Sequence, residues 1–164
     1  MHEVIAWIAA TPVSRLLQDW SIWLSPLLEI VHFIGLTLVI GCAGVVDLRL
    51  LGFMRGVPVA VAMQLVPWAI AGFVMNLVSG LLFIGIDPSL YLNSATWWGK
   101  VAFLVIAGTN VLVFERSTLA TRARLVAAGS DTTTGMKLVG ATSLVAWFMV
   151  LVLGRMLPYL GTAY

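Results

Sequence analysis

The sequence predicts an all-α integral membrane protein, a four-helix bundle preceded by an N-terminal interfacial amphipathic helix. Of its 164 residues, 61% are hydrophobic and only 10% are charged, whereas a soluble globular domain has roughly 25% charged residues. The mean hydropathy is +1.05. Four apolar stretches approach or exceed the ~20 residues that a helix needs to cross a bilayer core. Lipid must therefore cover most of the apolar side chains.

The four predicted spans form one transmembrane domain over residues 25–164. Proline, acidic and tryptophan residues mark their ends, because Asp-Pro stops a helix and tryptophan prefers the membrane interface. The second span stops before Asp87-Pro88, and the third begins at Trp97. We expect spans at about 26–51, 65–86, 97–114 and 138–157.

Residues 1–24 are predicted to form an interfacial helical segment. The chain has two hydroxyl-proline pairs, Thr11-Pro12 and Ser25-Pro26. A hydroxyl residue at the N-cap followed by proline at the first helical position is a helix-start signal. The pairs thus predict one helix from Pro12 and the first span from Pro26. The stretch between them is too short and too polar to span, and its tryptophans suit the interface. No basic segment precedes it, so we expect no cleavable signal.

The distribution of basic residues predicts the orientation. Cytoplasmic loops are enriched in lysine and arginine. Three basic residues fall on the side of the termini, and six of nine fall in the first and third loops: Arg49, Arg55, Arg116, Arg122, Arg124 and Lys137. We expect a multi-pass protein of a bacterial inner membrane with both termini on the periplasmic side. The polar stretch Ser117–Gly135 is expected to be a flexible cytoplasmic loop.

Several function classes are excluded or disfavoured by the sequence. The basic residues form no soluble patch for nucleic acid. The single cysteine, Cys42, has no partner for an internal disulfide and belongs to no zinc-binding pattern. No P-loop, catalytic triad or glycine-rich dinucleotide turn is present. We therefore expect a non-enzymatic protein whose partners are the lipid bilayer and other membrane subunits or a second copy of itself.

His32 is the main candidate for a functional residue, because ionisable groups inside a membrane are costly. It lies roughly 9 Å below Pro26 at the ~1.5 Å rise of a helix. Glu29 precedes it by one turn on the same face. Four interpretations remain open: a haem iron ligand, half of a carboxylate-histidine metal site, a quinone contact, or a structural histidine bonded to Glu29 or a neighbouring helix. The metal site would need a second Glu-x-x-His, which the sequence lacks.

Two residues near the end of the fourth span complete the predicted site. Met156 is the best candidate for a second axial haem ligand, because the only other histidine, His2, lies outside any span. Arg155 lies at nearly the depth of Glu29. We expect these charges to neutralise each other or bind one ligand together, with headgroup snorkelling of Arg155 as the alternative. The predicted cofactor-binding residues are thus Glu29, His32, Arg155 and Met156.

Other polar and small residues in the spans suggest packing. Four polar residues, Asn76, Ser79, Thr109 and Asn110, are expected to make interhelical hydrogen bonds. Five glycines permit close helix approach: Gly35, Gly41, Gly44, Gly72 and Gly80. At the inner end we expect a salt-bridge cluster of Asp47, Arg49, Glu115 and Arg116.

Several segments resemble a family of small uncharacterised bacterial four-helix membrane proteins. The likeness is carried by Trp23–Glu29, His32–Gly35, Val46–Gly52, Pro67-Trp68, Ser79–Phe83, Lys100, Asn110 and Gly154-Arg155. The layout is also distantly similar to cytochrome b561-like and copper-resistance D-like proteins. That similarity implies haem binding and electron transfer with quinone. Related sequences often carry histidine where this chain has Glu115, which implies the loss of an inner haem ligand.

The leading hypothesis is a non-enzymatic membrane subunit, accessory to a respiratory or redox complex. Its outer Glu29, His32 and Arg155 would hold a cofactor, a lipid or quinone headgroup, or a partner. The first alternative is an electron-transfer protein with one haem b on His32. The second is a small transporter, which would need a continuous polar pathway, and Asn76 and Asn110 alone make a poor one.

Overall fold

The computed structural model describes residues 2–160, which form helices and no strand. Four helical stretches are long and apolar enough to cross a membrane. They are centred on α3 (Ser21–Leu50), α5 (Val66–Ile86), α7 (Ala95–Arg116) and α9 (Thr134–Leu160). The predicted all-α, four-span architecture is confirmed, with helix ends a few residues from those expected.

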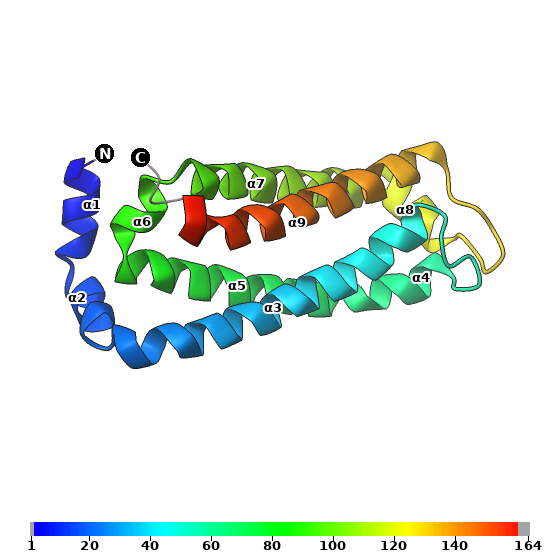
Figure 1. The fold of residues 1–164 in the computed structure, drawn as a ribbon. Coiled ribbons are helices and arrows are strands. Elements are labelled where there is room, and N and C mark those ends of the chain that lie inside the picture. Colours follow the sequence, from blue (N-terminus) through cyan, green and yellow to red (C-terminus); the bar gives the residue numbers. More distant parts are fainter. Residues whose placement is uncertain (1, 161–164) are drawn as a thin grey trace.

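Shorter helices cap the two ends of the bundle (Figure 1). At one end lie α1 (His2–Ala9), α2 (Pro12–Asp19) and α6 (Pro88–Leu92), together with the first and last described residues. This is called the histidine end, because His32 lies in this half of α3. At the other, called the basic end, lie α4 (Val59–Ala62), the 3-10 turn Met63–Leu65 and α8 (Thr118–Arg124). The six basic residues counted for orientation belong to it.

Helix α3 is the central element of the bundle. It packs along α5 on one side and against α9 on the other, while α7 packs along α9. Figure 1 shows α3 and α9 converging toward the basic end and separating toward the histidine end. The bundle is therefore two helix pairs joined mainly through α3 and α9.

One of the two predicted helix starts is confirmed. Thr11 caps α2, because its hydroxyl oxygen accepts the Ser14 N–H at 3.2 Å. The predicted start at Pro26 is wrong, since α3 begins at Ser21 and Pro26 lies inside it. The Leu24 N–H already donates to the Trp20 carbonyl at 2.9 Å. A proline this near the helix start removes one hydrogen bond and leaves the helix beyond it intact. The interfacial helix is accordingly shorter than predicted.

Two of the five predicted packing glycines bring α3 and α5 into backbone contact. A Cβ on Gly72 would lie 2.6 Å from the Gly35 carbonyl oxygen, and one on Gly35 would lie 2.8 Å from the Gly72 carbonyl oxygen. Any larger side chain at this crossing must push the helices apart. By contrast, a Cβ added to Gly41 or Gly44 would meet no heavy atom of a neighbouring element within 4 Å, so these two glycines do not serve close approach.

Buried hydrogen bonds order the chain at the basic end. The fully buried Arg49 donates to the backbone carbonyls of Val57 and, at 3.1 Å, Ser130. The Thr132 hydroxyl donates to the Leu50 carbonyl at 2.7 Å. The stretch Ser117–Gly135, predicted as a loop, also contains α8, which the Ser117 hydroxyl caps by accepting the Leu119 N–H. The Arg49 guanidinium satisfies carbonyls on both connecting segments at once.

The salt bridges at the basic end differ from those predicted. Glu115 pairs with Arg124 at 2.9 Å rather than with Arg116. Asp47 and Arg49, two residues apart on a helix, point in different directions and form no ion pair. Asp131 instead pairs with Lys137 at 2.9 Å and Arg55 at 3.1 Å. The Lys137 hydrogen bond, the Thr132 N–H and the Arg55 charge hold the pKa of Asp131 below its usual value.

Substitution of Gly72 by alanine tests the α3–α5 crossing. The new Cβ would lie 2.6 Å from a carbonyl oxygen and 2.7 Å from the Leu38 Cβ, so we expect a loss of about 1–3 kcal/mol in unfolding free energy. The measurement is unfolding of the purified protein in mixed micelles. Gly41→Ala is the matched control and should change stability by less than about 0.5 kcal/mol. Equal effects of the two substitutions would contradict the crossing.

Candidate ligand site at the histidine end

The centre of the site is a hydrogen bond between His32 of α3 and Ser79 of α5. The His32 Nδ1 lies 2.8 Å from the Ser79 Oγ, and Ser79 is almost completely buried. The Ser79 hydroxyl donates its single hydrogen to the Met75 carbonyl at 2.7 Å. In this arrangement its oxygen accepts a hydrogen from the Nδ1-protonated tautomer of His32. This leaves the Nε2 atom of His32 with a free lone pair.

Aromatic rings extend the site toward α6. The Phe83 ring meets the His32 ring edge-on at a centroid distance of 5.9 Å, and it stacks on Tyr91 at 6.4 Å. Burial, together with the negative charges of Asp87 and Glu29, raises the pKa of Tyr91 to about 12. The Tyr91 phenol is therefore a neutral donor at physiological pH. Glycine at position 80 leaves room beside the imidazole, because a Cβ there would lie 4.0 Å from the His32 Cε1.

Lys100 of α7 brings a positive charge to the same half of the bundle. It lies in the first turns of α7, at the same end of the bundle as His32. Its side chain lies along α9, where a Cβ on Gly154 would be 3.5 Å from the Lys100 Nζ. Within residues 2–160, Lys100 makes no hydrogen bond or ion pair. A charged group that is half-buried and unpaired in a span is a strong candidate for ligand binding.

Sequence reasoning did not include Lys100 among the site residues. It follows Trp97 and Trp98, two interfacial residues, and a lysine in that position is expected to extend to the headgroups. The signal that could have found it is Gly154, because a glycine on the facing helix leaves space for a lysine stem. That signal requires knowing that α7 packs on α9, which the sequence does not reveal.

The other predicted site residues lie apart from the His32–Ser79 bond. Glu29 is exposed, and its negative charge contributes to the raised pKa of Tyr91. Arg155 donates to the Tyr159 hydroxyl at 3.4 Å and lies 5.6 Å from the centre of that ring. Arg155 therefore has a local partner one turn away, and no ion pair within residues 2–160 joins it to Glu29. Met156 is 39% exposed. A ligand shared by these residues stays a prediction.

The structure groups no three His, Cys, Asp or Glu side chains of residues 2–160 in a geometry that could hold a metal ion. The interhelical role predicted for polar residues is confirmed for Ser79 and for Asn110, whose amide donates to the Val139 carbonyl of α9 at 3.1 Å. It is wrong for Asn76, which donates to the Gly72 carbonyl in its own helix. Thr109 is exposed.

Comparison with protein-family models, with curated proteins and with solved structures finds no match to this chain. The resemblance to cytochrome b561-like and copper-resistance D-like proteins therefore stays a prediction. The function is inferred below from the geometry of the site.

A double-mutant cycle between His32→Phe and Ser79→Ala tests the central hydrogen bond. Such bonds in membrane proteins contribute about 0.6 kcal/mol on average, so we expect a coupling energy of that order in unfolding experiments. Phenylalanine keeps the ring contact with Phe83 and removes only the nitrogens. The control pairs His32→Phe with Thr109→Ala and should show no coupling. A cycle without coupling at Ser79 would contradict the hydrogen bond.

Proposed function

We propose that this protein is a non-enzymatic membrane subunit, accessory to a respiratory or redox complex, and that its histidine end binds the headgroup of a quinone or quinol. The observation that carries the proposal is the imidazole of His32, which Ser79 orients and whose Nε2 is free in the Nδ1-protonated tautomer. Lys100, at the start of α7, lies in the same half of the bundle and makes no ion pair within residues 2–160.

The two groups match the chemistry of this ligand class. A quinol has hydroxyl groups that donate hydrogen bonds, and a quinone has carbonyl oxygens that accept them. The His32 Nε2 would accept from a hydroxyl, and the Lys100 ammonium would donate to a carbonyl. The rings of Phe83 and Tyr91 offer an aromatic wall for a planar headgroup. The tail would lie among lipid chains.

The accessory role is supported by the outer surface of the bundle. Large apolar side chains are exposed on all four long helices, among them Phe33, Leu81, Val105 and Phe148. These surfaces suit lipid or the helices of other membrane subunits. The described residues offer few charged groups for chemistry, so we assign binding rather than catalysis.

Haem b on His32 is the second candidate function. An axial histidine usually donates its other ring N–H to a nearby oxygen, which fixes the ring, and the Nδ1–Ser79 hydrogen bond has this form. The second axial ligand is the weak point, because Met156 is 39% exposed on α9. A haem here would need a ligand from another subunit or a shift of α9.

We further propose that the basic end is cytoplasmic and that both termini are periplasmic in a bacterial inner membrane. The support is the positive-inside rule. The six basic residues that predicted this orientation all belong to one end of the bundle.

The quinone proposal predicts different losses of quinol affinity for two substitutions of His32. In His32→Asn the amide keeps a donor near the position of Nδ1 but nothing replaces Nε2, whereas in His32→Gln the longer amide reaches toward Nε2. We expect affinity for decylubiquinol to fall about tenfold in His32→Asn, as for one lost hydrogen bond of about 1.4 kcal/mol, and to be retained in part in His32→Gln. Calorimetric titration of the purified protein with decylubiquinol measures this affinity.

The control for this experiment is Thr37→Ala, which changes an exposed residue of α3 bonded only to its own helix. It should bind like the unmodified protein. Equal affinity in all variants, or no binding to any of them, would overturn the quinone proposal. A haem absorption spectrum that is lost in His32→Asn would establish the second candidate instead.

The orientation is tested by labelling single cysteines in a Cys42→Ala background. Ala128→Cys lies at the basic end and Asn93→Cys at the histidine end, and both positions are exposed. A membrane-impermeant maleimide should label position 93 in intact spheroplasts and position 128 only after permeabilisation. The reverse pattern would contradict the proposed orientation.

A further inference from the structure

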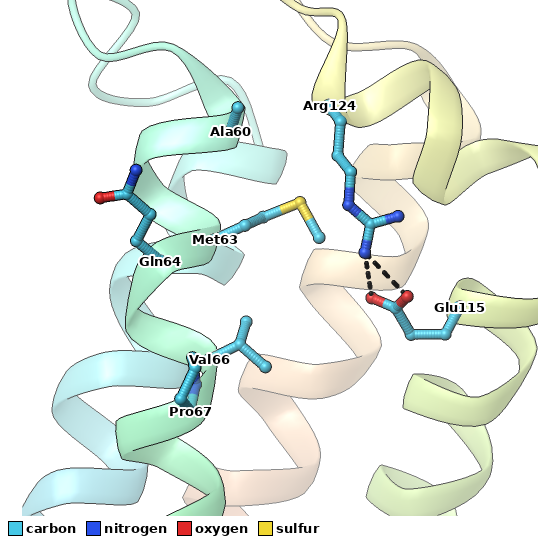
Figure 2. Close-up of a pocket in the computed structure, with 7 residues that line it drawn as sticks. All are labelled: Ala60, Met63, Gln64, Val66, Pro67, Glu115 and Arg124. Atoms are coloured by element: carbon cyan, nitrogen blue, oxygen red, sulfur yellow. Dashed lines mark hydrogen bonds and ion pairs between the residues drawn. The ribbon is translucent and has the colours of Figure 1, made fainter.

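A second candidate site lies at the basic end, far from His32. A cleft of about 320 Å³ opens between the start of α5 and the junction of α7 with α8. Figure 2 shows its lining: Ala60, Met63, Gln64, Val66, Pro67, Glu115 and Arg124. Met63 and Val66 point into it, and Arg124 reaches from α8 toward Glu115. One wall is thus apolar, and the other carries an ion pair.

The cleft continues onto an open side of the bundle. In residues 2–160, α5 packs mainly on α3 and α7 on α9, and no extensive contact joins α5 to α7. Exposed apolar residues line this side, including Ile70 and Val74 of α5 and Val111 of α7. The neighbouring Trp68 is 61% exposed, which suits the membrane–water interface. We infer from Trp68 that the cleft lies at headgroup depth. Ile70 and Val74 follow Val66 by one and two turns, so an exposed apolar face of α5 continues from the cleft along the span.

The Glu115–Arg124 ion pair leaves hydrogen-bonding atoms of both side chains free to bind a ligand. Only the Arg124 Nη2 contacts Glu115, at 3.2 and 2.9 Å from the two carboxylate oxygens. The Nε and Nη1 atoms of Arg124 donate no hydrogen bond within the described residues. Both side chains remain accessible, at 49% for Arg124 and 41% for Glu115. A guanidinium with free donors binds phosphate, and a carboxylate accepts hydrogen bonds from an ammonium group.

We propose that this cleft binds a phospholipid with a zwitterionic aminoethyl phosphate headgroup. Arg124 binds the phosphate and Glu115 accepts from the primary ammonium, while one acyl chain lies along the exposed apolar residues of α5 and α7. A choline headgroup carries no N–H to donate to Glu115. A glycerol headgroup brings a net negative charge next to the Glu115 carboxylate. The paired charges of the cleft therefore select the primary amine.

The test is native mass spectrometry of the delipidated full chain with equal amounts of dioleoyl phosphatidylethanolamine, phosphatidylcholine and phosphatidylglycerol. The unmodified protein should retain the ethanolamine lipid in preference to both others. In Arg124→Gln its binding should fall about tenfold, as for one lost charged hydrogen bond. In Glu115→Gln the preference should shift toward the glycerol lipid, because the repelling carboxylate is gone.

Arg122→Gln is the matched control, since Arg122 is an exposed arginine of the same helix and makes no ion pair within residues 2–160. It should keep the ethanolamine preference. Thermal unfolding of each variant shows whether it is folded. Glu115→Gln should change which lipid the protein prefers and should not abolish lipid binding, so misfolding cannot mimic its expected result. Equal binding of the three lipids by the unmodified protein, or the same loss in Arg122→Gln, would overturn the proposal.

Discussion

The close approach of α3 and α5 at Gly35 and Gly72 is the constraint on which the histidine end depends. Their backbones meet so closely that a Cβ on either residue would overlap the opposite carbonyl oxygen. His32 lies one helical turn from Gly35, and Ser79 lies two turns from Gly72 on the same face. With wider helix spacing, the 2.8 Å bond between Nδ1 and Oγ could not form. The orientation of the imidazole is thus a consequence of glycine packing.

The basic end is held by a different kind of interaction. Apolar side chains from several elements form a core there: Val46, Leu50, Val59, Phe114, Ala120, Ala123 and Met136. Arg49 crosses this core and bonds to carbonyls of two connecting segments. Because the connections are fixed, α8 is positioned so that Arg124 meets Glu115.

The two ends therefore suit different partners. At the histidine end α3 and α9 diverge (Figure 1), and His32 and Lys100 are only half-buried. At the basic end the Glu115–Arg124 pair lies across a cleft from the start of α5 (Figure 2). The two proposals differ accordingly: a planar headgroup at the first end, and a lipid headgroup at the second.

The sequence by itself determined the fold class and the number of long apolar helices, because hydrophobic length is a local property, and it singled out His32 as a candidate because an ionisable group in a span is costly. The sequence did not determine which side chains of different helices contact each other. Lys100, Ser79 and the Glu115–Arg124 pair became recognisable as parts of sites only from helix pairing. No ion pair within residues 2–160 joins Glu29 to Arg155, because equal depth along two helices does not place two side chains on facing surfaces. Which surfaces face each other depends on helix rotation, which close contacts such as that of Gly140 in α9 with the Asp47 carbonyl of α3 decide in the folded bundle.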